Sequence, residues 1–316
     1  VHGSPGEDFK DADRVNQFGR EWIKNHAGGS RPFFLYLHYM DPHEPYKPPS
    51  TDLERPESAS KLSFDTIKKR HLKKDWWPSW ERIYPFASKQ TPPQHVLEKT
   101  IYLYDSEIRY WDREFGRMTT FLSKRNLLKN SLIVVVSDHG EEFFLHGNWA
   151  HNHSLFNELI HVPLVIRPPE TMNYETGIVT RPVSLVRLRS TILDVLGLGH
   201  RSIRSPISLG MNSSEPDTQP IYSSWSQPGK SVHSLIRDGW KIHRFSNKNQ
   251  VAWRLYHLNS DISEQEDQRH EFPNRFRRMK KLLRDRTRKK HPASLSTVSL
   301  NRKLVQNQLE GLGYVE

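Results

Sequence analysis

The sequence of 316 residues contains no cysteine. Disulfide bonds, cysteine nucleophiles and thiolate metal ligands are therefore excluded from this chain. Long hydrophobic runs are missing too: the longest, FFLYL and LIVVV, have the length of strands and fall far short of the ~20 apolar residues that cross a bilayer. We also find no internal repeat. With 35% hydrophobic residues, the chain can still bury a core in one large domain or two unequal ones.

A starting methionine and a leader segment are missing as well. The first residue is Val1, and the opening VHGSPGEDFKDADR has neither the basic nor the apolar region of a signal peptide. We therefore expect that processing or truncation has removed a segment before Val1.

Acidic residues are scarce in the segment that holds most of the net charge of +11. Residues 274–290 contain ten lysines and arginines against the single acidic residue Asp285, a net charge of +9. Such a run most often forms a solvated helix face or a frayed tail. Less often it attracts an acidic polymer or a membrane, and least often it reads nucleic acid specifically. The remainder of the chain is nearly balanced, so we expect no specific nucleic-acid partner.

Hydrophobic periodicity predicts an α/β fold. Between residues 101 and 122 apolar side chains recur at spacings of three and four, which is typical of one helix face against a core. The segment 132–137 is apolar at nearly every position, as in strands buried on both faces of a parallel sheet. Segments 32–38, which ends where a proline-rich loop begins, and 162–167 are also interpreted as strands. Strands alternating with helices indicate right-handed crossovers.

Two regions of unequal size are predicted. Residues 1–214 form the α/β domain, which includes a helix over 184–197 and a long irregular insertion at about 50–93. The insertion is rich in tryptophan, and we interpret it as a loop tied to the surface by aromatic residues or as a lid. Residues 215–316 form an α+β subdomain with an antiparallel hairpin layer, the basic helix and a final amphipathic helix through 300–312.

Ionisable side chains gather where two predicted strands end. His38 and His43 follow the first strand, and Asp138 and His139 follow the second. Ligand sites of open α/β sheets lie beyond the carboxyl ends of the strands. Carboxylate and imidazole can fill part of a metal coordination shell, and Gly140 lets the backbone turn without crowding the ion. The pair predicts a divalent cation, with a capping aspartate beside a hydrogen-bonded histidine as the alternative.

Several segments together resemble one protein family. The stretch SDHGEEFFLHGNWAHNHSLFNELIHVPLVIRPP is similar to the metal-binding segment of the sulfatases, in the alkaline phosphatase superfamily. FFLYLHYMDPHEPYKPP resembles the family's strand ending in a Pro-His-x-Pro loop, and WRLYHLNSDISEQED its LYDLxxDPxEQxN hairpin. The resemblance spans nearly the whole chain. It implies an alkaline-phosphatase-like sandwich with a mainly parallel central sheet, plus a smaller C-terminal antiparallel sheet with helices.

The resemblance assigns roles to four side chains at the predicted site. Asp138 and His139 match two of the family's protein metal ligands. His43 matches the histidine that contacts the sulfate and helps to protonate the leaving oxygen. His151 stands where the family has a lysine or histidine that binds the ester oxygens, so we predict His43 and His151 as catalytic residues.

Three further residues of the same segment are given supporting roles. We assign His153 and His146 to substrate binding. His153 lies two positions after His151 and could exchange roles with it. His146 and Glu141 would also support the groups around the ester.

The resemblance implies one divalent metal. Ca²⁺ is the usual ion of the family, while the nitrogen ligand His139 leaves Mn²⁺ or Zn²⁺ open. The family's paired aspartates and its C/S-x-P-S-R motif, which carries the formylglycine nucleophile, are not in this sequence. The chain thus looks like the C-terminal two-thirds of a sulfatase. We expect formylglycine only in a missing N-terminal part and expect this chain alone to be inactive.

The predicted function is metal-dependent cleavage of a sulfate ester in a sulfated small molecule or carbohydrate. One alternative is a phosphodiester or phosphonate monoester hydrolase of the same superfamily, because the Asp-His pair does not distinguish sulfur from phosphorus. Another is a non-catalytic descendant that binds anionic polymers through its basic segment. The family resemblance favours an extracytoplasmic or lysosomal location. The coding sequence before Val1 would separate the three hypotheses.

Overall fold

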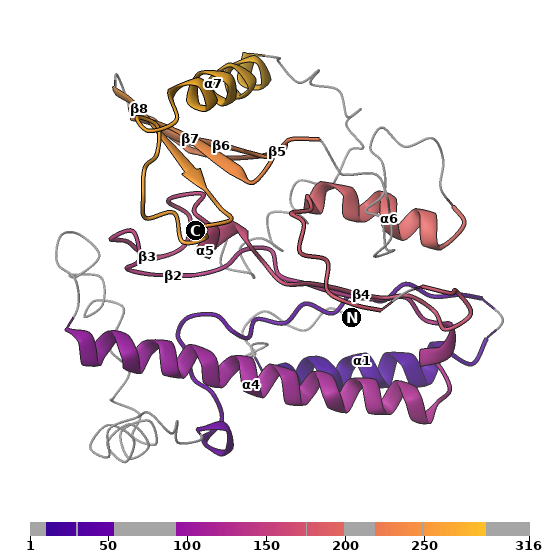
Figure 1. Ribbon diagram of the computed structural model, residues 1–316. Helices are drawn as coiled ribbons and strands as arrows, with labels where there is room; N and C mark the ends of the chain where they lie inside the picture. The colour runs from indigo at the N-terminus through magenta and orange to yellow at the C-terminus, as the bar shows by residue number, and fades with distance from the viewer. Residues whose placement is uncertain are drawn as a thin grey trace. The chain divides into compact units, whose positions relative to one another are not determined.

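The structure is a computed structural model that describes residues 11–53, 93–198 and 219–288, apart from residues 30, 175, 248 and 249 (Figure 1). The contacts divide the chain into one unit of residues 1–40 with 284–316 and a second of residues 41–283, and each is described by itself. Within the described ranges, no helix is long and apolar enough to span a membrane.

The first unit is built on helix α1 (Ala12–His26). Its buried residues follow the helical period and are Ala12, Asn16, Gly19 and Ile23. The following segment returns along this helix: the hydroxyl of Tyr39 donates to Asn16 Oδ1 at 2.7 Å, and the rings of Trp22 and Phe33 meet edge to face at 5.5 Å.

The strand predicted over 32–38 is wrong. These residues form no strand in the described structure, and the side chains of Phe34 and Tyr36 are 76% and 70% exposed. An aromatic-rich sequence favours extended backbone, but a strand also needs a neighbour that accepts and donates backbone hydrogen bonds. No described segment supplies that neighbour here.

Helix α4 (Gln94–Lys124) confirms the long helix predicted from the 3–4 spacing and extends it at the N-terminal end. Its buried face carries the acids Glu107 and Glu114 among apolar residues. The carboxylate of Glu107 accepts the backbone N–H of His43 at 3.1 Å and also that of Lys47. The helix thereby holds the proline-rich loop on which His43 lies.

Strands β1 (Ile133–Val136) and β4 (Leu164–Arg167) confirm two predicted strands, but they pair antiparallel with each other. The expected burial on both faces is not met, since Val136 is 40% and Val165 59% exposed. In the described residues this sheet has only two strands, so fewer neighbouring side chains cover its valines than in the interior of a larger parallel sheet.

Shorter elements lie between and after these strands. The excursion from β1 to β4 contains the hairpin of β2 (Glu142–Phe143) with β3 (Trp149–Ala150) and the single-turn helix α5 (Asn157–Ile160). Helix α6 (Leu188–Val195), preceded by a 3₁₀ turn at Leu185–Arg187, confirms the helix predicted over 184–197. Two further 3₁₀ turns are Ser50–Asp52 and Leu128–Asn130.

The predicted C-terminal antiparallel sheet is present, with strand order β5-β6-β7-β8. Its strands are β5 (Ile221–Gln227), β6 (Lys230–Arg237), β7 (Trp240–Asn247) and β8 (Gln250–His257). The β6–β7 turn consists of Asp238 and Gly239, both with positive φ, as a two-residue type I′ hairpin requires.

Helix α7 (Pro273–Arg288) covers one face of this sheet (Figure 1). Its Met279 and Leu283 join a buried cluster with residues of the sheet, namely Leu235, Trp240, Ile242 and Leu255. Because side chains alternate along a strand, Lys241 and His243 on either side of Ile242 point to the opposite face of the sheet.

Some predictions of domain organisation lie outside the described residues. They concern the insertion at 50–93, of which residues 54–92 are not described, and the final helix through 300–312. The limits 1–214 and 215–316 stay a prediction.

Candidate active site

The turn after β1 brings a carboxylate and an imidazole together. The backbone N–H of His139 donates to Asp138 Oδ1 at 2.9 Å, and His139 Nδ1 donates to the carbonyl of Gly140 at 2.9 Å. Since a carbonyl only accepts, the proton of the neutral ring is on Nδ1 and the lone pair on Nε2. That Nε2 lies 3.7 Å from Asp138 Oδ2. This spacing suits two ligands of one cation with bonds of about 2.0–2.4 Å.

Gly140 is required by a close backbone approach. Its N–H donates to the carbonyl of Leu159 at 2.9 Å, and a Cβ at this position would lie 2.0 Å from the carbonyl oxygen of Glu158. Both carbonyls belong to α5. The turn that carries Asp138 and His139 is therefore seated directly against that short helix.

His151 joins this turn to the proline-rich loop. Its ring stacks on His139 with centroids 4.1 Å apart and meets His43 edge to face at 5.6 Å. Its Nδ1 donates to Glu141 Oε1 at 3.0 Å, and the other oxygen of Glu141 accepts the hydroxyl of Tyr46 at 2.7 Å. The hydrogen bond to Glu141 raises the pKa of His151 despite the opposing effect of burial. The ring therefore holds a proton more readily than an ordinary histidine.

His43 has a different environment. Its Nδ1 donates to the carbonyl of Glu44 at 2.6 Å, so no carboxylate lies behind this ring as Glu141 lies behind His151. Desolvation by burial lowers the pKa of His43, and the nearby His151 lowers it further. At neutral pH His43 is the ring with its proton on Nδ1 only.

The predicted residues Asp138, His139, His43 and His151 thus lie in one cluster, as their assignment to a single site requires. The resemblance gave them their roles, and those roles stay a prediction. The sequence interpretation treated Glu141 only as a supporting group, and it did not include Tyr46. No spacing in the sequence predicts the contact between Tyr46 and Glu141, because these residues are 95 positions apart.

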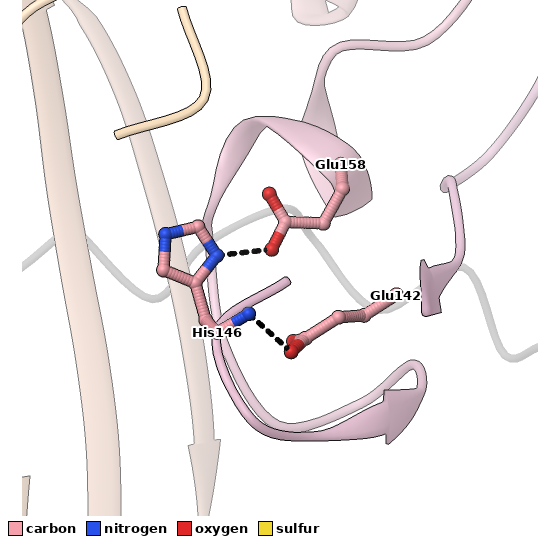
Figure 2. A group of neighbouring side chains, drawn as sticks. All are labelled: Glu142, His146 and Glu158. Carbon is pink, nitrogen blue, oxygen red and sulfur yellow. Dashed lines mark hydrogen bonds and ion pairs between the residues drawn. The ribbon is translucent and has the colours of Figure 1, made fainter. Parts of the chain in front are cut away.

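His146 and His153 are held by other carboxylates. His153 Nε2 donates to Glu142 Oε2 at 2.6 Å. His146 Nδ1 donates to Glu158 Oε1 at 2.5 Å (Figure 2). His146 Nε2 donates to the carbonyl of Glu264 at 3.1 Å. Burial opposes the charged ring, but these two hydrogen bonds raise the pKa of His146. Their assignment to substrate binding stays a prediction, and their contacts favour a supporting role.

Glu142, His146 and Glu158 offer three ligand atoms within 4.8 Å of one another, a spacing that a cation could use (Figure 2). Both ring nitrogens of His146 already donate hydrogen bonds, and the fully buried Glu142 accepts the backbone N–H of His146 and of Asn148. We interpret this group as a hydrogen-bonded support of the hairpin.

A fully buried charge cluster, which sequence reasoning missed, anchors α5 to the C-terminal sheet. Glu264 Oε2 accepts Lys241 Nζ at 2.8 Å and the backbone N–H of Asn157 at 2.7 Å, while Oε1 accepts His243 Nε2 at 2.6 Å. Lys241 Nζ also donates to Asn157 Oδ1 at 2.8 Å. Phe156 stacks on His146 at 3.5 Å and lies 5.0 Å from the ring of His243.

The protonation of this cluster follows from its contacts. Burial lowers the pKa of Lys241 and of His243. Burial alone would raise the pKa of Glu264, but its bonds to His243 and Lys241 lower it. We therefore assign a Lys241–Glu264 ion pair with a neutral His243 as hydrogen-bond donor.

The family model and the curated relatives that match this chain are both sulfatases. The sulfatase family model matches residues 5–198. Arylsulfatase K of Xenopus laevis is 26% identical over 302 residues, which cover 88% of this chain and 55% of that protein. The chain spans about half the length of the curated relatives it matches.

Two solved structures share the fold. One, in complex with its substrate D-glucosamine-2-N,6-O-disulfate, has a TM-score of 0.65 at 18% identity and covers 87% of this chain and 68% of that chain. A phosphonate monoester hydrolase from Silicibacter pomeroyi has a TM-score of 0.61 at 19% identity, with coverage of 90% and 62%. These similarities confirm the predicted alkaline-phosphatase-like α/β fold.

Glu264→Gln should lower the free energy of unfolding by about 3–5 kcal/mol, because Lys241 would stay buried without its countercharge. Urea unfolding at neutral pH measures this. Since the folded pKa of Glu264 is lowered, its contribution is complete above the pKa of an unfolded glutamate and is lost as the pH falls through the folded pKa.

Glu266→Gln is the matched control, since it makes the same change two residues away at an exposed position and should stay within about 0.5 kcal/mol. Adding Lys241→Met to Glu264→Gln should restore part of the loss, because it removes the unpaired charge. Equal stability of the Glu264→Gln and Glu266→Gln variants would contradict the anchoring role.

Gly140→Ala should cost about 1–3 kcal/mol of stability, because its methyl group would overlap the carbonyl of Glu158. The control is Gly116→Ala, which lies in α4 with no heavy atom within 4 Å of the added carbon and should be neutral or stabilising by up to about 1 kcal/mol. Thermal or urea unfolding of both variants measures the difference. Equal stability changes in the two variants would contradict the close approach between Gly140 and the carbonyl of Glu158.

Proposed function

The chain belongs to the sulfatase family, and from this premise we propose that the protein hydrolyses sulfate esters with a divalent cation held by Asp138 and His139. The observation that supports this most directly is the stacking of His151 on His139, with His43 at its edge, beside the carboxylate of Asp138. One carboxylate oxygen, one imidazole lone pair and two further imidazoles converge there. A sulfate ester needs such a combination, because negative charge develops on its leaving oxygen and its sulfuryl oxygens.

The donor atoms fit a divalent ion. Asp138 Oδ2 and His139 Nε2 lie 3.7 Å apart, and the hydrogen bond of His139 Nδ1 to Gly140 leaves Nε2 as the ligand atom. When bound, the ion would offset charge on the ester oxygens. Ca²⁺ is our first choice from the family, whereas the nitrogen ligand suits Mn²⁺ or Zn²⁺.

His151 and His43 would have different roles in the reaction, one as proton donor and one in binding the sulfate. Glu141 accepts the Nδ1–H of His151 and so stabilises the protonated ring, which can then donate from Nε2 to the leaving oxygen. His43, with only a carbonyl behind Nδ1, would bind the sulfate through Nε2. The sequence interpretation gave the acid role to His43; these hydrogen bonds favour His151 for it. We assign the nucleophile to no residue of this chain.

The proposed substrate class is a sulfated carbohydrate or small aryl ester. A curated relative is named an arylsulfatase, and one structural neighbour was solved with a disulfated glucosamine as substrate. The phosphonate monoester hydrolase among the neighbours keeps cleavage of a phosphorus ester as the second candidate.

The test of the function uses protein expressed from the complete coding sequence. We expect turnover of an aryl sulfate to exceed that of the matched aryl phosphonate, together with about one divalent metal per chain by elemental analysis. Asp138→Ala should abolish both turnover and bound metal, whereas Asp112→Ala, an exposed acid on α4, should change neither. Faster cleavage of the phosphonate would favour the second candidate, and full metal content in Asp138→Ala would exclude the proposed ligand.

Leaving-group dependence separates the two histidines. His151→Ala should reduce kcat most for sulfate esters of poor leaving groups, because an activated phenol needs little protonation. His43→Ala should reduce turnover by a similar factor for good and poor leaving groups. Steady-state kinetics with a series of esters measures both. The reverse pattern would return the acid role to His43.

A further inference from the structure

Helix α7 carries a row of basic side chains on the face turned away from the sheet. Arg277, Lys281, Arg284 and Arg288 follow one another at spacings of four, three and four residues, which places them on one side of the helix. All four are exposed. We call these four residues the basic row. The helix as a whole has eight lysines and arginines against Asp285 alone, a net charge of +7.

The opposite face of α7 is fixed to the sheet, so the row lies on a folded helix and not on a frayed tail. Met279 and Leu283 are buried in the cluster with Ile242 and Leu255. Apolar anchoring of this kind holds the backbone of the helix and therefore the spacing of the basic row.

Two of the other basic residues of α7 help to fasten it. The ammonium of Lys280 lies 5.0 Å from the ring centre of Trp253 and 5.4 Å from that of Phe276. The guanidinium of Arg275 lies 5.6 Å from the ring centre of Trp240. These cation–π contacts give Lys280 and Arg275 a structural use. Within the row, Arg277 donates hydrogen bonds to Asn274 Oδ1 at 2.6 Å and to the carbonyl of Pro273 at 3.4 Å, which are both uncharged acceptors on its own helix.

The charge of the basic row is not neutralised within the described part of the chain, where none of its four members forms an ion pair with an acid. Elsewhere a helical arginine has such a partner: Arg117 Nη1 lies 2.5 Å from Glu114 Oε1 on α4. Like charges three and four residues apart on a helix repel one another. An anionic polymer laid along the row would relieve that repulsion and release its own counterions.

We propose that the basic row binds a sulfated polysaccharide chain as a site separate from the one that cleaves it, an inference that rests on the proposed function. Guanidinium groups bind sulfate-like oxyanions in a bidentate manner, and three of the four residues are arginines. Membrane binding is disfavoured, because an interfacial helix inserts an apolar face and that of α7 is already buried against the sheet.

The location of the row determines which substrates it can affect. Ile242 of β7 points to α7, while its neighbours Lys241 and His243 point to Asn157, Glu264 and the segment that supports the candidate active site. Arg277 and Lys281 of the row therefore lie on the other side of the C-terminal sheet from that segment. A monosaccharide cannot contact both, but a long chain held at the row would raise the local concentration of its own ester groups.

The test is a triple charge reversal, Arg277→Glu, Lys281→Glu and Arg284→Glu, in the full 316-residue chain. The matched control reverses three exposed basic residues at and after the end of α4, Lys124, Arg125 and Lys129, and so changes net charge equally. Dextran sulfate is the probe, and surface plasmon resonance at several salt concentrations is the measurement. Circular dichroism and thermal unfolding check that each variant is folded.

We expect the row variant to bind dextran sulfate at least tenfold more weakly than the control. The slope of log affinity against log salt should fall by about two to three, since each lost charge releases roughly 0.7–0.9 counterion fewer. Equal weakening in both variants would overturn the proposal, because it would show a general charge effect. So would stronger row-dependent binding to phosphatidylserine vesicles or duplex DNA at the same salt.

Activity distinguishes failure of this inference from failure of the proposed function. In protein expressed from the complete coding sequence, the row variant should raise KM for a sulfated polysaccharide and leave kcat and KM for a small aryl sulfate unchanged. An unchanged polysaccharide KM would overturn the row as a substrate-binding surface. Absence of sulfatase turnover in the unmodified protein would instead remove the proposed function and, with it, the role inferred for the row.

Discussion

The arrangement of the site depends on the contacts that the carboxylate of Glu264 makes. It is 1% exposed, and its two oxygens bind the ammonium of Lys241, the imidazole of His243 and the backbone N–H of Asn157. A buried charge is tolerated only when it is paired and hydrogen-bonded. Its partners come from β7 and α5, whereas Glu264 follows β8. Moving either element would leave charged groups unpaired in the interior, so their relative position is closely constrained.

This constraint reaches the candidate ligands through backbone contacts. Asn157 is the first residue of α5, and the carbonyl of Leu159 in the same helix accepts the N–H of Gly140. Gly140 directly follows the Asp138–His139 pair, and the absence of a Cβ allows the approach. The side chain of Asp138 is 59% accessible and that of His139 28%, while Asn157 and Leu159 of the supporting helix are buried. An accessible ligand pair on a rigid support suits a site that must bind and release.

The histidines around the site differ because their acceptors differ. A carboxylate behind the ring of His151 favours its charged form, whereas a carbonyl behind that of His43 does not offset the effect of burial. The pKa values of two identical side chains, whose ring centroids lie 5.6 Å apart, are thus shifted in opposite directions. The same reasoning gives His146, which donates from both nitrogens, a structural use.

The sequence by itself determined the elements whose signal is local: the 3–4 periodicity of α4, the β-branched strand β1 and the alternating strands of the C-terminal sheet. It also led, through the family resemblance, to the group of Asp138, His139, His43 and His151, whose roles stay a prediction. Only the tertiary structure decided what depends on contacts between distant positions. The segment 32–38 has the composition of a strand but no partner in the described residues, β1 pairs antiparallel across a long excursion, and Glu264 meets Asn157 over 107 positions. Proton affinity and burial belong to this second group, because they are set by neighbours in space and leave no periodic mark along the chain.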